Sequence, residues 1–171
     1  MARMKLIPDS EVLAVTLKLL LLNGEKAVTF SAVAQKCKLA APTLVQRFGT
    51  CPAMIDAALA LAWDQLEAQT VAAFAEAQGK AKGVQGILKA LSGPIDSPAL
   101  VTASLKSPVL AQRAKAWRDQ VEAALTLKLG SGAKAAETAA LTFAAWQGRL
   151  LWDGAGGKGF RLGEALKRLT D

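Results

Sequence analysis

Apolar side chains recur every three or four positions through most of this chain, in one stretch after another. This spacing predicts amphipathic helices rather than strands. Gly and Pro interrupt the pattern at the places where helices would end and begin. Ala, Leu, Glu, Lys and Gln are frequent, and clusters of β-branched residues are few. The sequence therefore predicts an all-α fold.

Three helices are predicted near the N-terminal end. The first runs from about Ser10 to Asn23, with Asp9 or Ser10 as its cap, and is apolar over so much of its surface that it should be sandwiched between neighbours. Two short helices joined by a tight turn follow within Thr29–Met54, where Thr29 is a suitable N-cap and Pro42 suits a first helical turn. This arrangement is the helix-turn-helix pattern of proteins that read the major groove.

A larger helical part is predicted to follow, so that residues 1–51 form one domain and residues 52–171 another. The helices expected in the second domain are Pro52–Ala77, Val84–Leu91, one that starts at Ser97, Pro108–Leu129, Ala133–Trp152 and Phe160–Leu169. Apolar residues cover more than half the circumference of the helix expected over Ala133–Trp152, so both of its sides should be buried. It is either a central core helix or one side of a homodimer interface.

The helix-turn-helix resembles the DNA-binding domain of the tetracycline-repressor (TetR) family over roughly Val12–Leu61. The resemblance rests on the order Thr29-x-x-x-Val33-Ala34-x-x-Cys37-x-Leu39-x-x-x-Thr43-Leu44-x-x-x-Phe48-Gly49-Thr50. It implies a three-helix DNA-binding domain followed by a larger ligand-binding and dimerisation domain. The expected function is that of a dimeric transcriptional regulator, a repressor that a small apolar ligand releases from operator DNA through a population shift.

The resemblance also implies three sets of site residues. The expected DNA-binding residues are Thr29, Lys36, Lys38, Ala41, Pro42, Thr43, Gln46 and Arg47. The expected walls of the ligand pocket are Trp63, Phe74, Leu91, Trp117, Val121, Phe143 and Trp146, with Gln112, Gln120 and Gln147 as residues that orient the ligand. The expected dimer interface consists of Leu141, Ala144, Ala145, Gly148, Trp152, Leu162 and Leu166. For each pocket aromatic taken alone, we favour plain core packing over ligand contact.

Two recognition-helix residues suggest specific contacts. A Gln side chain pairs in two ways with adenine and an Arg side chain with guanine, so Gln46 and Arg47 are candidates for base reading. Arg47 also replaces a histidine that contacts phosphate in the family, and we favour the phosphate contact for it. Thr29, Lys36 and Lys38 are the expected phosphate partners.

The chain departs from the TetR pattern at five positions. It has Val45 for the usual tyrosine, Arg47 for histidine, Cys51 for lysine, Lys38 for the turn glycine and Ala40 for the serine cap. These changes leave a second hypothesis open, a ligand sensor or protein-interaction module on the same scaffold that has weakened or lost DNA binding. A third hypothesis, a helical carrier of lipid or acyl chains, fits the apolar composition but leaves the helix-turn-helix unexplained.

Charge and residue chemistry narrow the function classes. Residues 1–51 hold seven Lys and Arg against three Asp and Glu, or +4 of the total net charge of +7, which favours contact with phosphates. The chain has no His and no Tyr, and its two cysteines are not in a CxxC motif, so we expect no enzyme activity, no metal site and no cofactor. Cys37 is expected in the core, and Cys51 is a candidate redox sensor. Free thiols favour a cytoplasmic location, and no apolar run is long enough to span a membrane.

Overall fold

The computed structural model describes residues 7–79, 81–93, 95–156 and 164, and within them it forms helices and no strand. The chain divides into two compact units, Met1–Asp64 and Gln65–Asp171. The division falls inside one long helix, α4 (Cys51–Glu76), whereas the expected first domain ends at residue 51. No helix of the described part is both long and apolar enough to cross a membrane.

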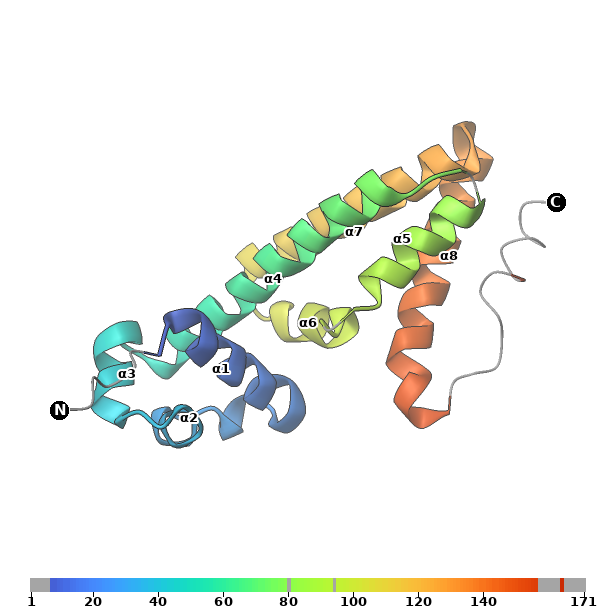
Figure 1. Cartoon of the computed structure of the whole chain (residues 1–171). Coiled ribbons are helices and arrows are strands. Elements are labelled where there is room, and N and C mark those ends of the chain that lie inside the picture. The colour runs from blue at the N-terminus through green and yellow to red at the C-terminus, as the bar shows by residue number, and fades with distance from the viewer. Residues whose placement is uncertain (1–6, 80, 94, 157–163, 165–171) are drawn as a thin grey trace. The chain divides into compact units, whose positions relative to one another are not determined.

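The first unit contains α1 (Asp9–Asn23), α2 (Phe30–Cys37), α3 (Ala41–Phe48) and the start of α4, with a short 3₁₀ turn at Glu25–Ala27 (Figure 1). α1 packs against α2, and α2 packs against α3. The buried side chains of this unit come from all four helices and include Val12, Leu19, Val33, Cys37, Leu44, Met54, Leu59 and Trp63. The helices are therefore held by one shared apolar core.

The capping predictions for this unit are partly confirmed. The Thr29 hydroxyl accepts a hydrogen bond from the Ala32 backbone N–H at 3.1 Å, as expected of an N-cap. The prediction for α1 is wrong, because this helix is preceded by Pro8 and has no side-chain cap. Asp9 lies inside the first turn of α1, where its negative charge still stabilises the helix through interaction with the helix dipole.

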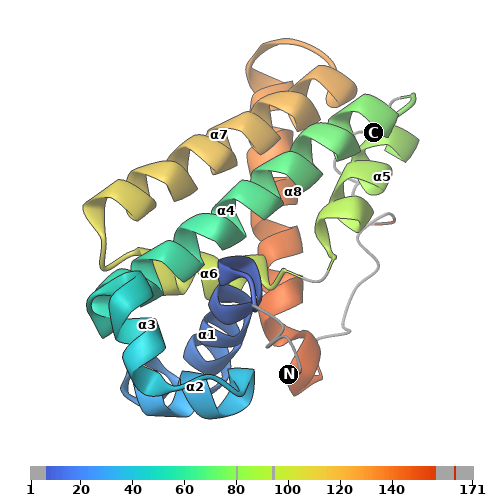
Figure 2. The same ribbon diagram turned by 60° about the vertical axis from the view of Figure 1, so that its left-hand side comes forward.

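The second unit contains the rest of α4, α5 (Ala81–Leu91), α6 (Ser97–Ser104), α7 (Pro108–Leu129) and α8 (Gly132–Trp152), with a 3₁₀ turn at Asp153–Ala155. α7 and α8 follow each other across a short turn and pack together, and α6 contacts both (Figure 2). The predicted bounds of these helices hold to within a few residues; α5 starts earliest relative to the prediction, at Ala81. The helix expected over Phe160–Leu169 lies outside the described residues.

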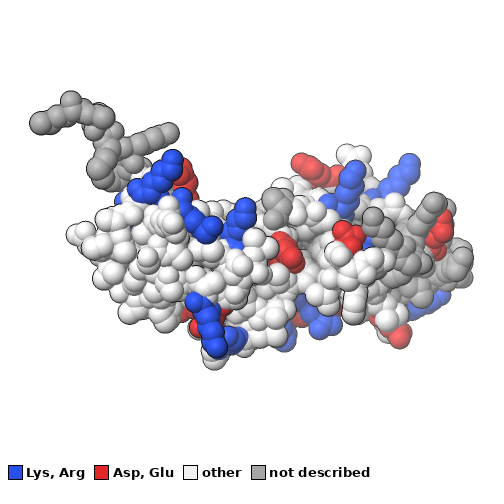
Figure 3. All heavy atoms as spheres, turned by 90° about the horizontal axis from the view of Figure 1, so that it is seen from below, with Lys and Arg blue, Asp and Glu red and all other residues white. Residues whose placement is uncertain are grey.

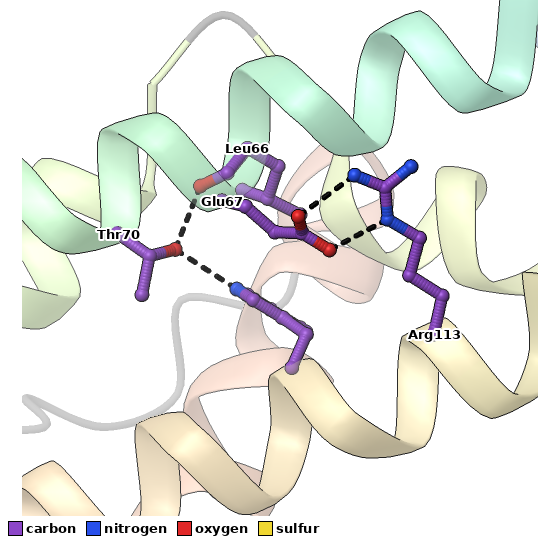
Figure 4. A network of polar contacts seen from close by, with 5 residues as sticks. Leu66, Glu67, Thr70 and Arg113 are labelled. Carbon is purple, nitrogen blue, oxygen red and sulfur yellow. Dashed lines mark hydrogen bonds and ion pairs between the residues drawn. The ribbon is translucent and has the colours of Figure 1, made fainter.

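Polar contacts connect α4 to α7 within the second unit. Arg113 donates from Nε and Nη2 to the two carboxylate oxygens of Glu67, at 2.6 and 2.7 Å (Figure 4). One helical turn further along each helix, the Trp117 indole Nε1 donates to the Thr70 hydroxyl at 2.9 Å, and that hydroxyl donates to the Leu66 carbonyl. The buried polar atoms of this contact are thus paired, which removes the cost of burying them.

Candidate nucleic-acid interface

The turn between α2 and α3 has the geometry that a helix-turn-helix requires. Lys38 ends α2 with φ +54°, the left-handed conformation that glycine adopts most easily, and the Leu39 N–H donates to the Ala34 carbonyl at 2.9 Å. Lys38 therefore takes the backbone conformation of the glycine that it replaces in the resemblance. The Lys38 side chain is exposed beside the turn, as is that of Lys36.

α3 is a short helix with one fully buried anchor, Leu44, and an outward face that is mostly apolar. Its exposed residues are Pro42, Val45 and Gln46. Val45 is the notable one, because 46% of its surface is exposed although the side chain is aliphatic. Ala41 and Thr43 are half-buried at the edge of this face. The face thus offers one exposed polar side chain, that of Gln46, together with apolar surface and the half-buried Thr43 hydroxyl at its edge.

Arg47 is held by groups of its own unit. Its Nη1 donates to the Ile7 carbonyl oxygen at 2.8 Å and to Asp9 Oδ1 at 3.1 Å, and the Arg47 side chain is 18% exposed. The contact joins the last turn of α3 to the beginning of α1. Arg47 thus positions α3 in this structure, a role that sequence pattern did not reveal because its partners lie 40 and 38 positions away.

The remaining predicted phosphate partners lie on the surface of the first unit. Thr29 is exposed at the start of α2, and its hydroxyl, which accepts from Ala32, retains its own proton for donation. At the start of α4, the Thr50 hydroxyl accepts from the Ala53 N–H at 3.2 Å beside the half-buried Cys51. Figure 3 shows basic side chains scattered among broad uncharged areas on the face that it presents.

In the second unit, the residues expected to line a ligand pocket are mainly core. Trp117, Phe143 and Trp146 contact one another, with ring centroids 5.6 to 6.4 Å apart, and the Trp146 indole donates to the Ser92 hydroxyl. Leu91 and Val121 are fully buried and Phe74 is half-buried, while Trp63 is fully buried in the first unit. The residues expected to orient a ligand differ in setting: Gln112 and Gln120 are exposed, and Gln147 donates to the Ser97 hydroxyl.

A hollow of about 500 Å³ lies between α5 and α8. Its lining consists of Gln85, Leu88, Lys89, Ser92, Trp146, Arg149, Leu150 and Asp153. Of the predicted pocket residues, only Trp146 takes part. Lys89 and Arg149 give the lining two positive charges against the one negative charge of Asp153, and the described residues show no ion pair for either cation. Sequence pattern did not indicate this hollow, since its residues come from two separate helices and the residues that directly follow each of them.

The described residues of the expected dimer interface share one side of α8. Leu141 is 51% exposed and Trp152 is 61% exposed, Ala144 is exposed, and Ala145 and Gly148 are half-buried. Leu151, also exposed, extends the same side. The opposite side of α8 is buried through Ala139, Thr142, Phe143 and Trp146. Leu162 and Leu166 lie outside the described residues.

The same arrangement of helices is found in solved structures of other proteins. No family model matches the sequence, and no curated protein matches it. Among solved structures, a transcriptional regulator from Rhodococcus sp. Rha1 superposes with a TM-score of 0.71 at 20% identity, over 96% of this chain and 94% of the other. The TetR family transcriptional regulator PfmR from Thermus thermophilus gives 0.66 at 18% identity, over 94% of both chains. The chain has a TetR-like fold.

The same fold recurs at still lower identity. A transcriptional regulator of the TetR/AcrR family from Thermobifida fusca gives a TM-score of 0.53 at 12% identity, over 95% of this chain and 93% of the other. These likenesses cover nearly the whole chain, so the TetR-like fold includes the second unit, which the sequence resemblance did not reach. The fold prediction is therefore confirmed for both parts.

Proposed function

We propose that this protein is a dimeric regulator of transcription that inserts α3 into the major groove of operator DNA. The observation that carries the proposal is the first unit itself: a tight turn places α3 across α2 with Pro42, Val45 and Gln46 on its outward face. The TetR-like fold over almost the whole chain supports it, because solved structures with this fold are named as transcriptional regulators. Exposed Lys36 and Lys38 supply positive charge beside the turn.

The roles within the interface follow from side-chain chemistry. Gln46 is the exposed amide of α3 and suits bidentate pairing with adenine. Thr29, Lys36 and Lys38 are suited to phosphate contacts, which fix the register of the protein on the duplex. Arg47 contributes by holding α3 in place, and the other N–H groups of its guanidinium suit a phosphate contact.

The test is selection of binding sites from a random DNA pool, followed by titration with salt. We expect a palindrome with half-sites about 34–36 Å apart, and an affinity that falls steeply as salt rises. Lys36→Ala and Lys38→Ala should each lower the salt dependence by about one released counterion without altering the selected sequence. Recovery of no sequence above nonspecific binding from a folded protein would contradict the proposal.

The homodimer proposal rests on the exposed apolar side of α8. A Leu, a Trp and small residues along one helix side permit close approach of a second helix and bury apolar surface. Leu141→Glu should therefore give monomers in sedimentation experiments and weaken binding to a palindrome. Leu127→Glu is the matched control, because Leu127 is 81% exposed on α7, outside this surface. Equal behaviour of the two variants would overturn the assignment.

The effector is proposed to bind in the second unit and to shift the population toward a conformation that releases DNA. The hollow between α5 and α8 combines Leu88, Leu150 and Trp146 with the cations Lys89 and Arg149. A small molecule with an apolar body and one negative charge suits this lining better than a purely apolar one. Tryptophan fluorescence should then show saturable binding of such compounds that Arg149→Ala weakens, whereas binding unchanged in this variant would place the effector elsewhere.

The second candidate function is a sensor or interaction protein that no longer binds DNA. The observation that favours it is the engagement of Arg47 by Ile7 and Asp9, together with Val45 and Cys51 at the positions of the usual tyrosine and lysine. The two candidates differ in a single result. A dimer that binds small molecules but selects no DNA sequence is a sensor, and a dimer that selects a palindrome is a regulator.

A further inference from the structure

The outward face of α3 carries less hydrogen-bonding capacity than a recognition helix usually offers. Three of its eight residues are exposed, and two of them, Pro42 and Val45, have side chains without donors or acceptors. The Arg47 guanidinium, the one cation of α3, is turned toward Ile7 and Asp9. Besides Gln46 and the half-buried Thr43 at the edge of the face, sequence discrimination by this helix must therefore draw on apolar contact.

In the major groove, apolar contact has one principal partner among the unmodified bases. Thymine presents its C5-methyl group there, whereas adenine, guanine and cytosine present only donors and acceptors beside ring carbons. A valine with 46% of its surface exposed has two methyl groups available for this contact. Val45 and Gln46 follow Pro42 by three and four positions, so the three residues lie along one side of α3.

We propose that Val45 is a specificity-determining residue that packs against the C5-methyl group of a thymine in each half-site. This inference rests on the proposed DNA-binding function and adds the chemical feature that α3 reads beside the base contacted by Gln46. The TetR pattern has a tyrosine at this position, and its hydroxyl suits a contact with a DNA phosphate. With Val45 in its place, the contact is made to a base instead.

The experiment replaces thymines of the selected palindrome one at a time by deoxyuridine, which lacks only the methyl group. For the unaltered protein, one position in each half-site should weaken binding roughly threefold to tenfold when it loses its methyl, as expected for one methyl group removed from an apolar contact. Val45→Ala should weaken binding to the thymine site by a similar factor and should show no further loss with deoxyuridine at that position. The two losses are thus coupled.

Two controls separate this contact from general effects. Val109→Ala removes the same atoms from a valine that is 78% exposed on α7, and it should bind both sites like the unaltered protein. Gln46→Ala should weaken binding while retaining the sensitivity to deoxyuridine. Since Ala favours a helix and Val45 is not buried, Val45→Ala should fold, which circular dichroism verifies.

The outcomes distinguish this inference from the function on which it rests. A palindrome whose thymine methyls have no effect, or whose methyl effect persists unchanged in Val45→Ala, overturns the role of Val45 and leaves the DNA-binding function intact. Failure to select any sequence overturns both. A parallel selection with 5-methylcytosine in place of cytosine identifies the source of the methyl group, and enrichment only in that pool would overturn the assignment to thymine.

Discussion

α3 and α7 are held in place in different ways. α3 has eight residues and one fully buried side chain, Leu44, and its further attachment is the contact from Arg47 to Ile7 and Asp9. α7 has 22 residues and a continuous buried stripe. The members of that stripe are Leu110, Ala114, Trp117, Val121 and Leu125.

The difference separates a helix fixed by burial from a helix fixed by a few contacts. An eight-residue helix is marginal by itself, so its position depends on whatever packs against it. For α7, the ion pair with Glu67 adds to a position that the stripe already determines. For α3, a single polar contact is a large share of all the contacts that hold the helix in place. This is consistent with the proposed role of α3, because a helix held by few contacts can shift when an effector changes the conformation of the protein.

The largest expected effect is that of Trp117→Ala in the α7 stripe. The side chain is 2% exposed and contacts Phe143 and Trp146, and its truncation leaves a cavity, so we expect a loss of about 3–5 kcal/mol in the free energy of unfolding. Trp117→Phe keeps an aromatic ring but removes the hydrogen bond to Thr70, at a smaller loss. Urea denaturation measures both. Equal losses for the two variants would show that the hydrogen bond, and not burial, determines the position of α7.

Leu44→Ala is the corresponding change in α3, with an expected loss of about 2–4 kcal/mol. Because Leu44 is the one fully buried anchor of α3, amide protons of this helix should lose protection from hydrogen exchange before those of α7. Leu127→Ala, at an exposed leucine of α7, should stay within about 0.5 kcal/mol of the unaltered protein. Uniform loss of protection across both helices would contradict the comparison.

The same difference explains what the sequence could predict. The stripe of α7 recurs at helical spacing, so its bounds and buried residues could be predicted from local pattern alone. Thr29, Pro42 and Gly49 likewise mark the helix ends around the turn. Local pattern carries no signal for contacts between distant residues. Arg47 and Asp9, or Arg113 and Glu67, are 38 and 46 positions apart, and many charged partners were available to each.

The hollow between α5 and α8 could not be predicted from the sequence for a related reason. An aromatic at a buried helical position has the same local pattern whether it packs against other rings or lines a cavity. Trp117, Phe143 and Trp146 pack against one another, and of these three only Trp146 also lines the hollow. The other residues that line the hollow are mostly polar or charged, and local pattern does not mark them as pocket residues. The presence of both Lys89 and Arg149 in the lining depends on how the two helices pack.

Arg47→Ala tests the polar contact of α3, and its expected effect on stability is smaller than that of Leu44→Ala. We expect a loss of about 1 kcal/mol in the stability of the first unit, because the arginine bonds to a carbonyl and to the largely exposed Asp9. A double-mutant cycle with Asp9→Asn should isolate the ion pair as the smaller part. The pair Lys115 and Asp119, exposed on α7, is the matched control, and its cycle should give about 0.3–0.5 kcal/mol. A coupling between Arg47 and Asp9 below that value would assign the contact to the Ile7 carbonyl.

The smallest expected effect is a change in the stability of the first unit at alkaline pH. Burial, with Glu11 nearby, raises the pKa of the Cys37 thiol on α2 above its ordinary value of 9.0. A raised pKa means that the folded state holds the proton more tightly than the unfolded state. The contribution of the Cys37 thiol to the free energy of unfolding is therefore fully present below about pH 9 and is lost as pH rises through the folded-state pKa. The described part of the second unit contains no cysteine. The stability difference between the unaltered protein and Cys37→Ala should therefore shrink as pH rises above about 9, as measured by urea denaturation at each pH, with Cys51→Ala as the control. A constant difference over this range would show that Cys37 ionises as easily in the folded protein as in the unfolded chain.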